Sequence, residues 1–115
     1  MALSPAVITL LAHFNKRMGM YIGEPSKGGV IAFLTGLECG THLCGQDAGF
    51  VSAMSGWLTK TYGVTSDCLG WPGQIQRLAD LRDVSWLEAY VVVSGEVLEW
   101  AGAGDTGPTT PTSAP

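Results

Sequence analysis

Three cysteines and one histidine are the residues of this sequence that are best suited to hold a metal ion. Cys39, His42 and Cys44 lie close together in the chain, and Cys68 follows farther on. Three thiolates and one imidazole can complete a tetrahedral zinc site. The spacing, however, differs from the paired Cys-x-x-Cys pattern that is typical of zinc knuckles. A free buried cysteine also behaves as a small hydrophobic side chain, so the sequence requires no cofactor, and zinc at these four residues is an alternative.

The spacing of the polar residues gives little support to catalysis. A reactive thiolate at Cys44 would have only His42 as a nearby base in the sequence. No spacing places two carboxylates on one helical face as a general acid–base pair, and neither a Gly-x-Ser-x-Gly elbow nor a phosphate-binding loop is present. We therefore favour a protein without catalytic residues. A small-molecule-binding protein, or a small biosynthetic tailoring enzyme with an apolar pocket, is the alternative.

A second group of residues, in the stretch KRMGMYIGEPS at 16–26, is suited to contact another protein. Tyr21 can bury its ring and keep its hydroxyl hydrogen-bonded, while glycines on both sides permit backbone angles that other residues avoid. Arg17 can cover the last carbonyls of a preceding helix. One interpretation is a rigid corner between two helices whose residues serve packing. The other is a partner-contact ridge made of Arg17, Met20 and Tyr21.

The four tryptophans are the other side chains that could anchor a partner. Large aromatic rings dominate protein cores and are also frequent in the hot spots of interfaces. Trp71 stands at the start of a predicted helix and Trp100 precedes the C-terminal tail, so we expect this pair to be the more exposed, although a core position is the favoured interpretation for each tryptophan. The predicted partner-binding residues are Arg17, Met20, Tyr21, Trp71 and Trp100.

The composition favours a small globular protein that contacts another protein or itself. The chain has 115 residues, enough for one domain with a single core, and 46% of them are apolar. Charged residues make up only 14% of the chain, against about 25% in an average domain. A surface with so few charges favours a contact patch or self-association into an oligomer.

Charge and hydropathy argue against two classes of partner and indicate a compartment. The net charge is −4 and the six lysines and arginines are scattered, whereas nucleic-acid-binding proteins concentrate positive charge on one face. No apolar stretch approaches the roughly 18 residues of a membrane span, and no secretory signal is recognisable. The odd number of cysteines does not fit a closed disulfide framework. We therefore predict a cytoplasmic protein that binds neither nucleic acid nor membranes.

Capping residues and apolar spacing predict four helices in the first part of the chain. Ser4 before Pro5, and Pro25 before Ser26, are patterns that are typical of helix starts. Apolar residues recur at spacings of three and four within each helix. The predicted elements are a helix at 5–17, an extended connection at 20–22, and helices at 24–40 or 24–45, 47–62 and 71–79.

The segment at 83–100 allows two interpretations. A run of valines followed by Ser94-Gly95 could form a β-hairpin, since valine favours strands and Ser-Gly favours turns. Ser85 and Glu88, however, have the spacing of a capping box, in which each side chain accepts a hydrogen bond from the other residue's backbone amide. We favour a helix and keep a hairpin at 90–100 as the alternative.

Together these elements predict an all-α single domain of four to five helices over residues 1–101. With a hairpin at 90–100 the fold would instead be α+β. Residues 102–115 are rich in glycine, proline and threonine and lack large apolar side chains, so they cannot recover the entropy of ordering by burial. We predict that they form a disordered tail.

The stretch KRMGMYIGEPS is similar to a segment of the DNA gyrase B subunits and their relatives. In that family the segment precedes a helix that carries a catalytic Glu and a magnesium-binding Asn, and an Asp-x-Gly-x-Gly adenine site follows. Here the next predicted helix offers Glu38 without the Asn, and DAGF at Asp47 lacks the second glycine. The chain is also too short for the αβ sandwich that such a site needs. We therefore do not predict an ATPase.

A longer similarity covers residues 5 to about 100. The order of RMGMYIGEPS, FLTGLECG, GWLTKTYGV and LGW resembles a family of small bacterial helical proteins, largely uncharacterised, with an Arg-Pro-x-Met-Tyr-Leu-Gly and Gly-Trp pattern. Met18 departs from this pattern, because the family has a proline there. The resemblance implies a helical fold and, because some members are encoded beside polymorphic toxin genes, an immunity-like role. The matching positions are Arg17, Met20, Tyr21, Gly23, Ser26, Phe33, Leu34, Gly36, Trp57, Gly70 and Trp71.

Overall fold

The computed structural model describes residues 3–46 and 48–102, and every regular element in these residues is a helix. The prediction of a small all-α domain is therefore confirmed, with six helices in the described residues where the sequence predicted four or five. Gly102, the first residue of the predicted tail, ends the last helix, and the rest of that tail lies outside the described residues. The elements are α1 (Pro5–Lys16), α2 (Met18–Ile22), α3 (Lys27–Leu43), α4 (Phe50–Tyr62), α5 (Gly70–Arg82) and α6 (Trp86–Gly102).

Side-chain caps set the starts of α1 and α3. The Oγ of Ser4 accepts a hydrogen bond from the backbone N–H of Val7 at 3.2 Å, and Pro5 occupies the first turn. The Oγ of Ser26 accepts one from the backbone N–H of Gly29 at 3.1 Å. Each serine satisfies an amide that the helix itself leaves without a partner. The predicted start of α1 is confirmed, whereas α3 begins at Lys27 rather than at residue 24.

α6 is one continuous helix, so the alternative hairpin is wrong. The backbone N–H of Glu88 donates to the Oγ of Ser85 at 3.1 Å, and the backbone N–H of Ser85 donates to the Oε1 of Glu88 at 3.5 Å. This is the reciprocal arrangement of a capping box. Val93 and Val97 then share one helical face and have no exposed surface. Burial of this face outweighs the strand preference of the valines.

The predicted extended connection at 20–22 is also wrong, because this segment belongs to the short helix α2. The backbone N–H of Met20 donates to the carbonyl of Arg17 at 2.9 Å, and that of Gly23 donates to the carbonyl of Gly19 at 3.1 Å. Gly23 ends the helix with a φ of 77°, in the left-handed region that favours glycine. α2 is the helix that raises the number above the prediction.

The remaining predicted helices are confirmed with shifted ends. α3 ends at Leu43, between its two predicted end points. α4 begins at Phe50 rather than at residue 47, and Asp47 lies outside the described residues. Gly63 ends α4 in the left-handed conformation, as the sequence predicted. No helix in the described ranges is long and apolar enough to cross a bilayer.

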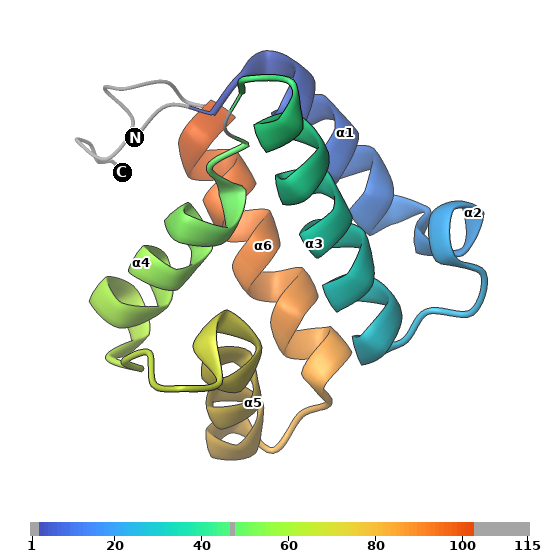
Figure 1. Ribbon diagram of the computed structural model, residues 1–115. Coiled ribbons are helices and arrows are strands. Elements are labelled where there is room, and N and C mark those ends of the chain that lie inside the picture. The colour runs from blue at the N-terminus through green and yellow to red at the C-terminus, as the bar shows by residue number, and fades with distance from the viewer. Residues whose placement is uncertain (1–2, 47, 103–115) are drawn as a thin grey trace.

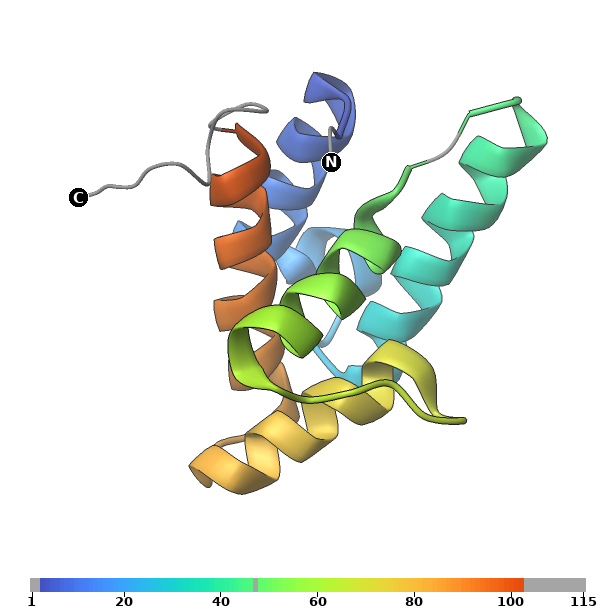
Figure 2. The same ribbon diagram turned by 90° about the vertical axis from the view of Figure 1, so that its left-hand side faces the viewer.

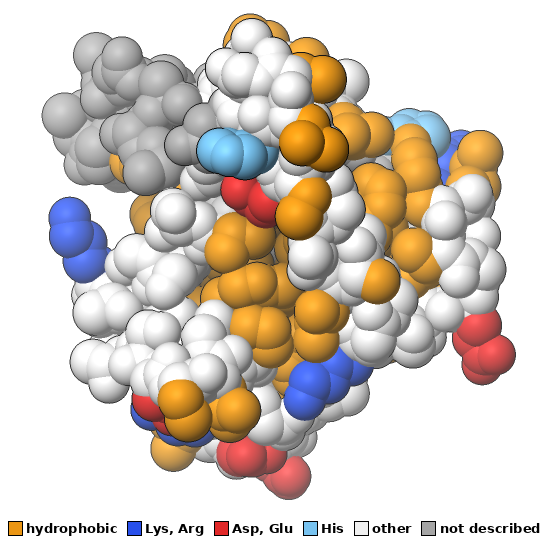
Figure 3. All heavy atoms as spheres, viewed as in Figure 1, with side chains coloured by type: hydrophobic (Ala, Val, Ile, Leu, Met, Phe, Trp, Pro, Cys, Tyr) orange, Lys and Arg blue, Asp and Glu red, His pale blue; other side chains and the backbone are white. Residues whose placement is uncertain are grey.

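α6 packs against three other helices, α1, α4 and α5. α4 lies on one side of α6, and α5 runs across the lower ends of both (Figures 1 and 2). α2 projects at the edge of the molecule, between α1 and α3 in the chain (Figure 1). On the face shown in Figure 3, hydrophobic side chains form a band between α3 and α4. The helix pair α3 and α4 therefore leaves part of the hydrophobic interior open to this face.

The core lies where α1, α4 and α5 meet α6. Phe14, Phe50 and Tyr90 are among its largest side chains and have no exposed surface. The Nδ2 of Asn15 donates to the Oγ of Ser94 at 2.9 Å, and the hydroxyl of Tyr90 donates to the Oδ1 of Asn15 at 3.0 Å. These bonds join α1 to α6 inside the core. Burial raises the pKa of the Tyr90 phenol above its ordinary value.

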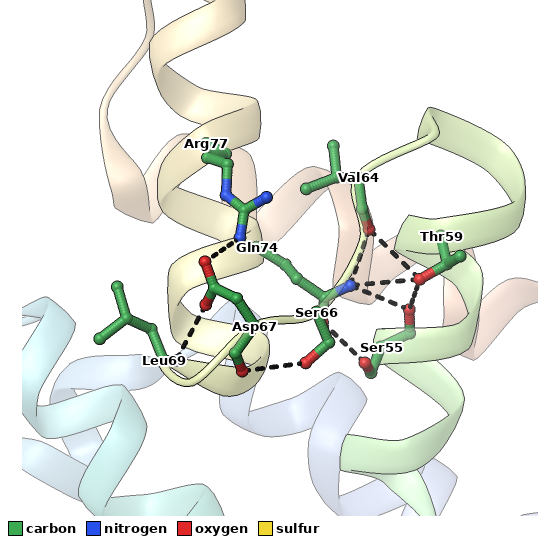
Figure 4. A network of polar contacts seen from close by, with 8 residues as sticks. All are labelled: Ser55, Thr59, Val64, Ser66, Asp67, Leu69, Gln74 and Arg77. Atoms are coloured by element: carbon green, nitrogen blue, oxygen red, sulfur yellow. Dashed lines mark hydrogen bonds and ion pairs between the residues drawn. The ribbon is translucent and has the colours of Figure 1, made fainter.

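A network of polar contacts around Gln74 fastens the loop between α4 and α5 (Figure 4). Gln74 has no exposed surface. Its Nε2 donates to the carbonyl of Val64 at 2.8 Å, and its Oε1 accepts from the Oγ of Ser55 at 2.6 Å. At the outer edge of the network, Arg77 pairs with Asp67. A buried amide without partners costs about 1–3 kcal/mol. These hydrogen bonds therefore explain why Gln74 can be buried in the core, and no binding or catalytic role is needed to explain it.

Candidate partner-binding site

The predicted ridge lies at the α1–α2 corner, which we define by His13, Arg17, Met20 and Tyr21. Arg17 joins the two helices, and its backbone N–H donates to the carbonyls of His13 and Phe14 at 2.9 and 3.2 Å. Its φ of −133° and ψ of 49° break the helical path between α1 and α2. This break sets α2 apart from α1 at the edge of the molecule (Figure 1).

Tyr21 is held in place through both its hydroxyl and its ring. The hydroxyl shares a hydrogen bond of 2.6 Å with the Nδ1 of His13. The ring meets Phe14 and Phe33 edge-on, with centroids 5.6 and 5.5 Å away, an arrangement that aromatic rings prefer. Tyr21 is nevertheless 38% exposed. It therefore presents a fixed aromatic surface to solvent.

Phe14 and Phe33 form the base on which Tyr21 rests. Their rings are stacked, with centroids 4.0 Å apart and an angle of 3° between the planes. Phe14 comes from α1 and Phe33 from α3, so the stack joins these helices beside α2. We call His13, Phe14, Tyr21 and Phe33 the corner cluster. This grouping could not be predicted from the sequence, because no regular spacing relates His13 or Phe33 to Tyr21.

The corner also carries apolar and positively charged groups on its surface. Met20 is 71% exposed. Lys16 and Arg17 are exposed too, and their side chains form no hydrogen bond or ion pair with the residues that the structure describes. Hydrophobic, basic and histidine side chains lie together at this edge (Figure 3). Such a surface suits a carboxylate that stands beside an apolar side chain.

The four residues predicted as zinc ligands do not converge. Cys39 and His42 are exposed residues of α3, Cys44 caps the end of that helix, and Cys68 lies in the loop before α5. All three cysteines are free and exposed. Within residues 3–46 and 48–102, no three His, Cys, Asp or Glu side chains are grouped to hold a metal ion. The described residues therefore provide no arrangement of side chains that supports the zinc alternative.

The expectation that Trp71 is exposed is wrong. Only 9% of its surface is accessible, because the first turn of α5 faces α6. Its ring lies 5.9 Å from that of Trp86 and 6.4 Å from that of Tyr90, measured between centroids. Trp71 is a core residue in this structure and exposes too little surface to anchor a partner.

Trp100, the last predicted partner-binding residue, lines a groove of about 350 Å³ between α4 and α6. Its ring is half-buried and lies against Trp57, with centroids 5.9 Å apart and an angle of 43° between the planes. We call this feature the α4–α6 groove. The residues that line it are Ser52, Ala53, Gly56, Trp57, Lys60, Thr61 and Trp100.

Glu96 of α6 holds two aromatic side chains of α4 next to this groove. Its Oε1 accepts hydrogen bonds from the Nε1 of Trp57 at 2.9 Å and from the hydroxyl of Tyr62 at 2.7 Å. Burial and the hydrogen bond to Glu96 raise the pKa of Tyr62 to about 12, although the guanidinium of Arg82 acts in the opposite direction. We call Trp57, Tyr62, Glu96 and Trp100 the groove cluster. No pattern in the sequence distinguishes Glu96 from the other carboxylates, because its role depends on the packing of α4 against α6.

Comparisons with protein-family models, with curated proteins and with solved structures give no match to this chain. A function can therefore be inferred only from the residues of the chain itself. The α1–α2 corner and the α4–α6 groove are two surfaces from which a function can be argued.

Proposed function

We propose that this protein is a non-catalytic module that binds another protein through the α1–α2 corner. The supporting observation is that Met20, 71% exposed, and Tyr21, 38% exposed, stand at one edge beside basic side chains that have no partner among the described residues. Aromatic residues and arginine are enriched among the residues that contribute most to binding at protein interfaces. The corner offers Tyr21 and Arg17 in adjacent turns.

Preorganisation of Tyr21 favours its use as an anchor. Binding usually costs about 0.5–1.5 kcal/mol for each rotatable side chain that becomes ordered. The hydrogen bond to His13 and the edge contacts with Phe14 and Phe33 already restrict the Tyr21 ring in the free protein. A partner that covers the exposed part of this ring therefore gains apolar burial at a smaller entropic cost.

The charges at the corner define the chemistry of the partner. The chain as a whole has a net charge of −4, yet Lys16 and Arg17 put two adjacent cations at this edge. A guanidinium binds carboxylates through two parallel hydrogen bonds. We therefore infer a partner surface that presents an acidic residue beside an apolar side chain, the latter covering Met20 and Tyr21.

An immunity-like role is the specific form of this function that the family resemblance implies. In that role the partner is the product of a neighbouring toxin gene, and the complex forms in the cytoplasm. Products of adjacent genes are therefore the first partners to test. The binding chemistry proposed for the corner does not depend on this choice.

The test measures how variants of the corner affect binding to a partner. The protein is coexpressed with the products of adjacent genes, a complex is purified, and its Kd is measured by titration calorimetry. Tyr21→Ala is expected to raise the Kd about 30-fold or more, because truncating an anchor costs about 2 kcal/mol or more. Arg17→Ala is expected to slow association and to reduce its dependence on salt.

Leu81→Ala is the matched control for Met20→Ala. Leu81 is 77% exposed, close to the 71% of Met20, but it belongs to α5. Met20→Ala is expected to weaken binding while Leu81→Ala leaves the Kd unchanged. Thermal unfolding of each variant separates a loss of binding from a loss of folding. Equal effects of these two substitutions would show that the corner is not the binding site.

A further inference from the structure

The α4–α6 groove carries an inference that is independent of the corner. Trp57 of α4 meets Trp100 of α6, whereas Tyr62, farther along α4, meets Glu96, which comes earlier in α6. The two helices therefore run in opposite directions along the groove (Figure 1). The volume of the groove is about 350 Å³, near the lower end of the range of about 300–1,000 Å³ for small-molecule sites. A groove of this size suits a ligand of one or two fused rings.

Two indole rings form the aromatic wall of the groove. The Nε1 of Trp57 donates to the Oε1 of Glu96 at 2.9 Å, which restricts the Trp57 ring. This ring lies against that of Trp100, with centroids 5.9 Å apart and an angle of 43° between the planes, and both side chains are only half-buried. A flat ring can therefore cover the exposed parts of both indoles without first ordering Trp57.

One face of α4 forms a side of the groove and has a notch at Gly56. Ser52, Gly56 and Lys60 follow one another at a spacing of four residues, so they lie along one face of the helix, and all three line the groove. A Cβ placed at Gly56 meets no atom within 4 Å, and the φ of Gly56 lies outside the left-handed region. The notch is therefore open because a side chain is missing there, and the backbone itself would accept another residue.

The charge of the groove is opposite to that of the whole chain. The chain has a net charge of −4, yet Lys60 is the one charged residue among the described residues that line the groove. Its ammonium group forms no hydrogen bond or ion pair with any other described residue. The carboxylate of Glu96 is already bonded to Trp57 and Tyr62. The groove therefore offers a cation that lacks a partner among the described residues, beside an aromatic wall.

We propose that the α4–α6 groove binds a small planar aromatic compound that carries a carboxylate. The ring of the ligand lies on the exposed parts of Trp57 and Trp100 and fills the notch at Gly56. The carboxylate pairs with the ammonium group of Lys60, which follows Gly56 by about one helical turn, or about 5.4 Å along α4. A bicyclic aromatic acid spans a distance of this order between its ring and its carboxylate.

The charge of Lys60 selects an acid among compounds with the same ring. A neutral aromatic compound covers the indoles but leaves the ammonium group without an anionic partner. An aromatic cation brings a like charge next to Lys60. The affinity of the groove should therefore follow the charge of the ligand, and this dependence distinguishes the proposed site from a merely apolar surface.

The experiment titrates the full chain with 2-naphthoate and follows the indole N–H signals in the proton–nitrogen NMR spectrum. The signals are assigned with single Trp→Phe variants. Those of Trp57 and Trp100 are expected to move together, with half-saturation at about 1 mM, a typical affinity for a ligand of this size. The Trp86 signal is expected to stay in place, because its indole N–H donates to the carbonyl of Pro72 at 3.0 Å. Trp57 and Trp100 signals that do not move at about 10 mM ligand overturn the proposal.

The role of Lys60 is tested with a neutral analogue of the same shape. We expect 2-naphthamide to bind the unaltered chain about 5-fold more weakly than 2-naphthoate, since an exposed ion pair contributes up to about that factor. Lys60→Met is expected to make the two affinities equal. Equal affinities in the unaltered chain overturn the proposal.

Lys16→Met is the matched control, because it removes the same charge from an exposed position of α1. It is expected to leave the affinity for 2-naphthoate unchanged. The α1–α2 corner also combines basic and aromatic side chains, so a larger effect of Lys16→Met than of Lys60→Met would place the ligand there and overturn the proposal.

Gly56→Leu tests the notch. Leucine is a better helix former than glycine, and a Cβ at this position meets no atom, so the variant is expected to keep its melting temperature. Its side chain fills the notch and is expected to raise the Kd for 2-naphthoate about 10-fold or more, because the ligand ring loses its contact with the groove. A folded Gly56→Leu chain that binds 2-naphthoate as tightly as the unaltered chain overturns the proposal.

Discussion

The corner cluster and the groove cluster each place a tyrosine between helices and give its hydroxyl a partner on another helix. Tyr21 of α2 is bonded to the imidazole of His13 on α1, and Tyr62 of α4 is bonded to the carboxylate of Glu96 on α6. The clusters differ in the charge of that partner. A hydrogen bond to an ionised group contributes about 1.5–3 kcal/mol, whereas a neutral bond contributes about 0.5–1.5 kcal/mol.

The two clusters are also held together by different kinds of contact. Glu96 receives bonds from both Trp57 and Tyr62, so the groove cluster holds α4 against α6 through polar contacts. The corner cluster depends on stacking between Phe14 and Phe33, and its polar bond lies at an exposed edge. We therefore expect the fold to tolerate loss of the edge bond, which is the condition for Tyr21 to serve as the proposed anchor.

The largest effect is expected from removing the base of the corner cluster. Phe14 has no exposed surface and stacks on Phe33. Phe14→Ala is expected to lower the free energy of unfolding by about 4 kcal/mol, because it removes this stack and leaves a cavity. Urea denaturation at constant m-value measures the change. Phe33→Ala is expected to lower the free energy of unfolding by less than Phe14→Ala does, because Phe33 is only partly buried. A larger loss for Phe33→Ala would show that Phe33 of α3, and not Phe14 of α1, is the more important ring of the stack.

A smaller effect is expected from removing the acceptor of the groove cluster. Glu96→Ala leaves the indole N–H of Trp57 and the hydroxyl of Tyr62 without their acceptor. We expect the free energy of unfolding to fall by about 2 kcal/mol. Glu99→Ala is the matched control, since Glu99 is an exposed carboxylate of the same helix with no hydrogen bond in the described residues. A loss no larger than that of the control would contradict the role of Glu96.

Alkaline pH should weaken the groove cluster through Tyr62. Folding raises the pKa of this phenol from 10.0 to about 12, so the folded state holds the proton more tightly than the unfolded state. The stabilisation is fully present below pH 10 and is lost as the pH rises from 10 to about 12. Urea denaturation across this range should show a shallower decline for Tyr62→Phe. The decline that remains includes Tyr90, whose pKa burial also raises.

Local signals in the sequence account for most of the fold. Ser4 and Ser85 were predicted as helix caps from local patterns alone, and each accepts the backbone hydrogen bond that the pattern implies. These interactions span three residues, so they can be predicted without knowing the tertiary structure. The same holds for Gly63, which ends α4 in the left-handed conformation.

The candidate sites could be predicted only in part, because they depend on contacts between distant residues. The ridge of Met20 and Tyr21 is exposed as expected. The exposure of Trp71 was predicted wrongly, since its place at a helix start does not reveal which neighbour that helix faces. The bond between Glu96 and Trp57 joins residues 39 positions apart, and no spacing rule relates them.

The comparison between the clusters is sharpest when the same substitution is made in both. Tyr62→Phe removes a hydroxyl bonded to a carboxylate and is expected to cost about 1.5 kcal/mol of unfolding free energy, whereas Tyr21→Phe removes an exposed neutral bond and is expected to cost about 0.5 kcal/mol. Both variants keep the ring, so the difference isolates the polar bond. Urea denaturation under identical conditions measures both values. Equal losses would mean that the bond to His13 supports the fold as strongly as the bond to Glu96 does. The main role of Tyr21 would then be to stabilise the fold rather than to bind a partner.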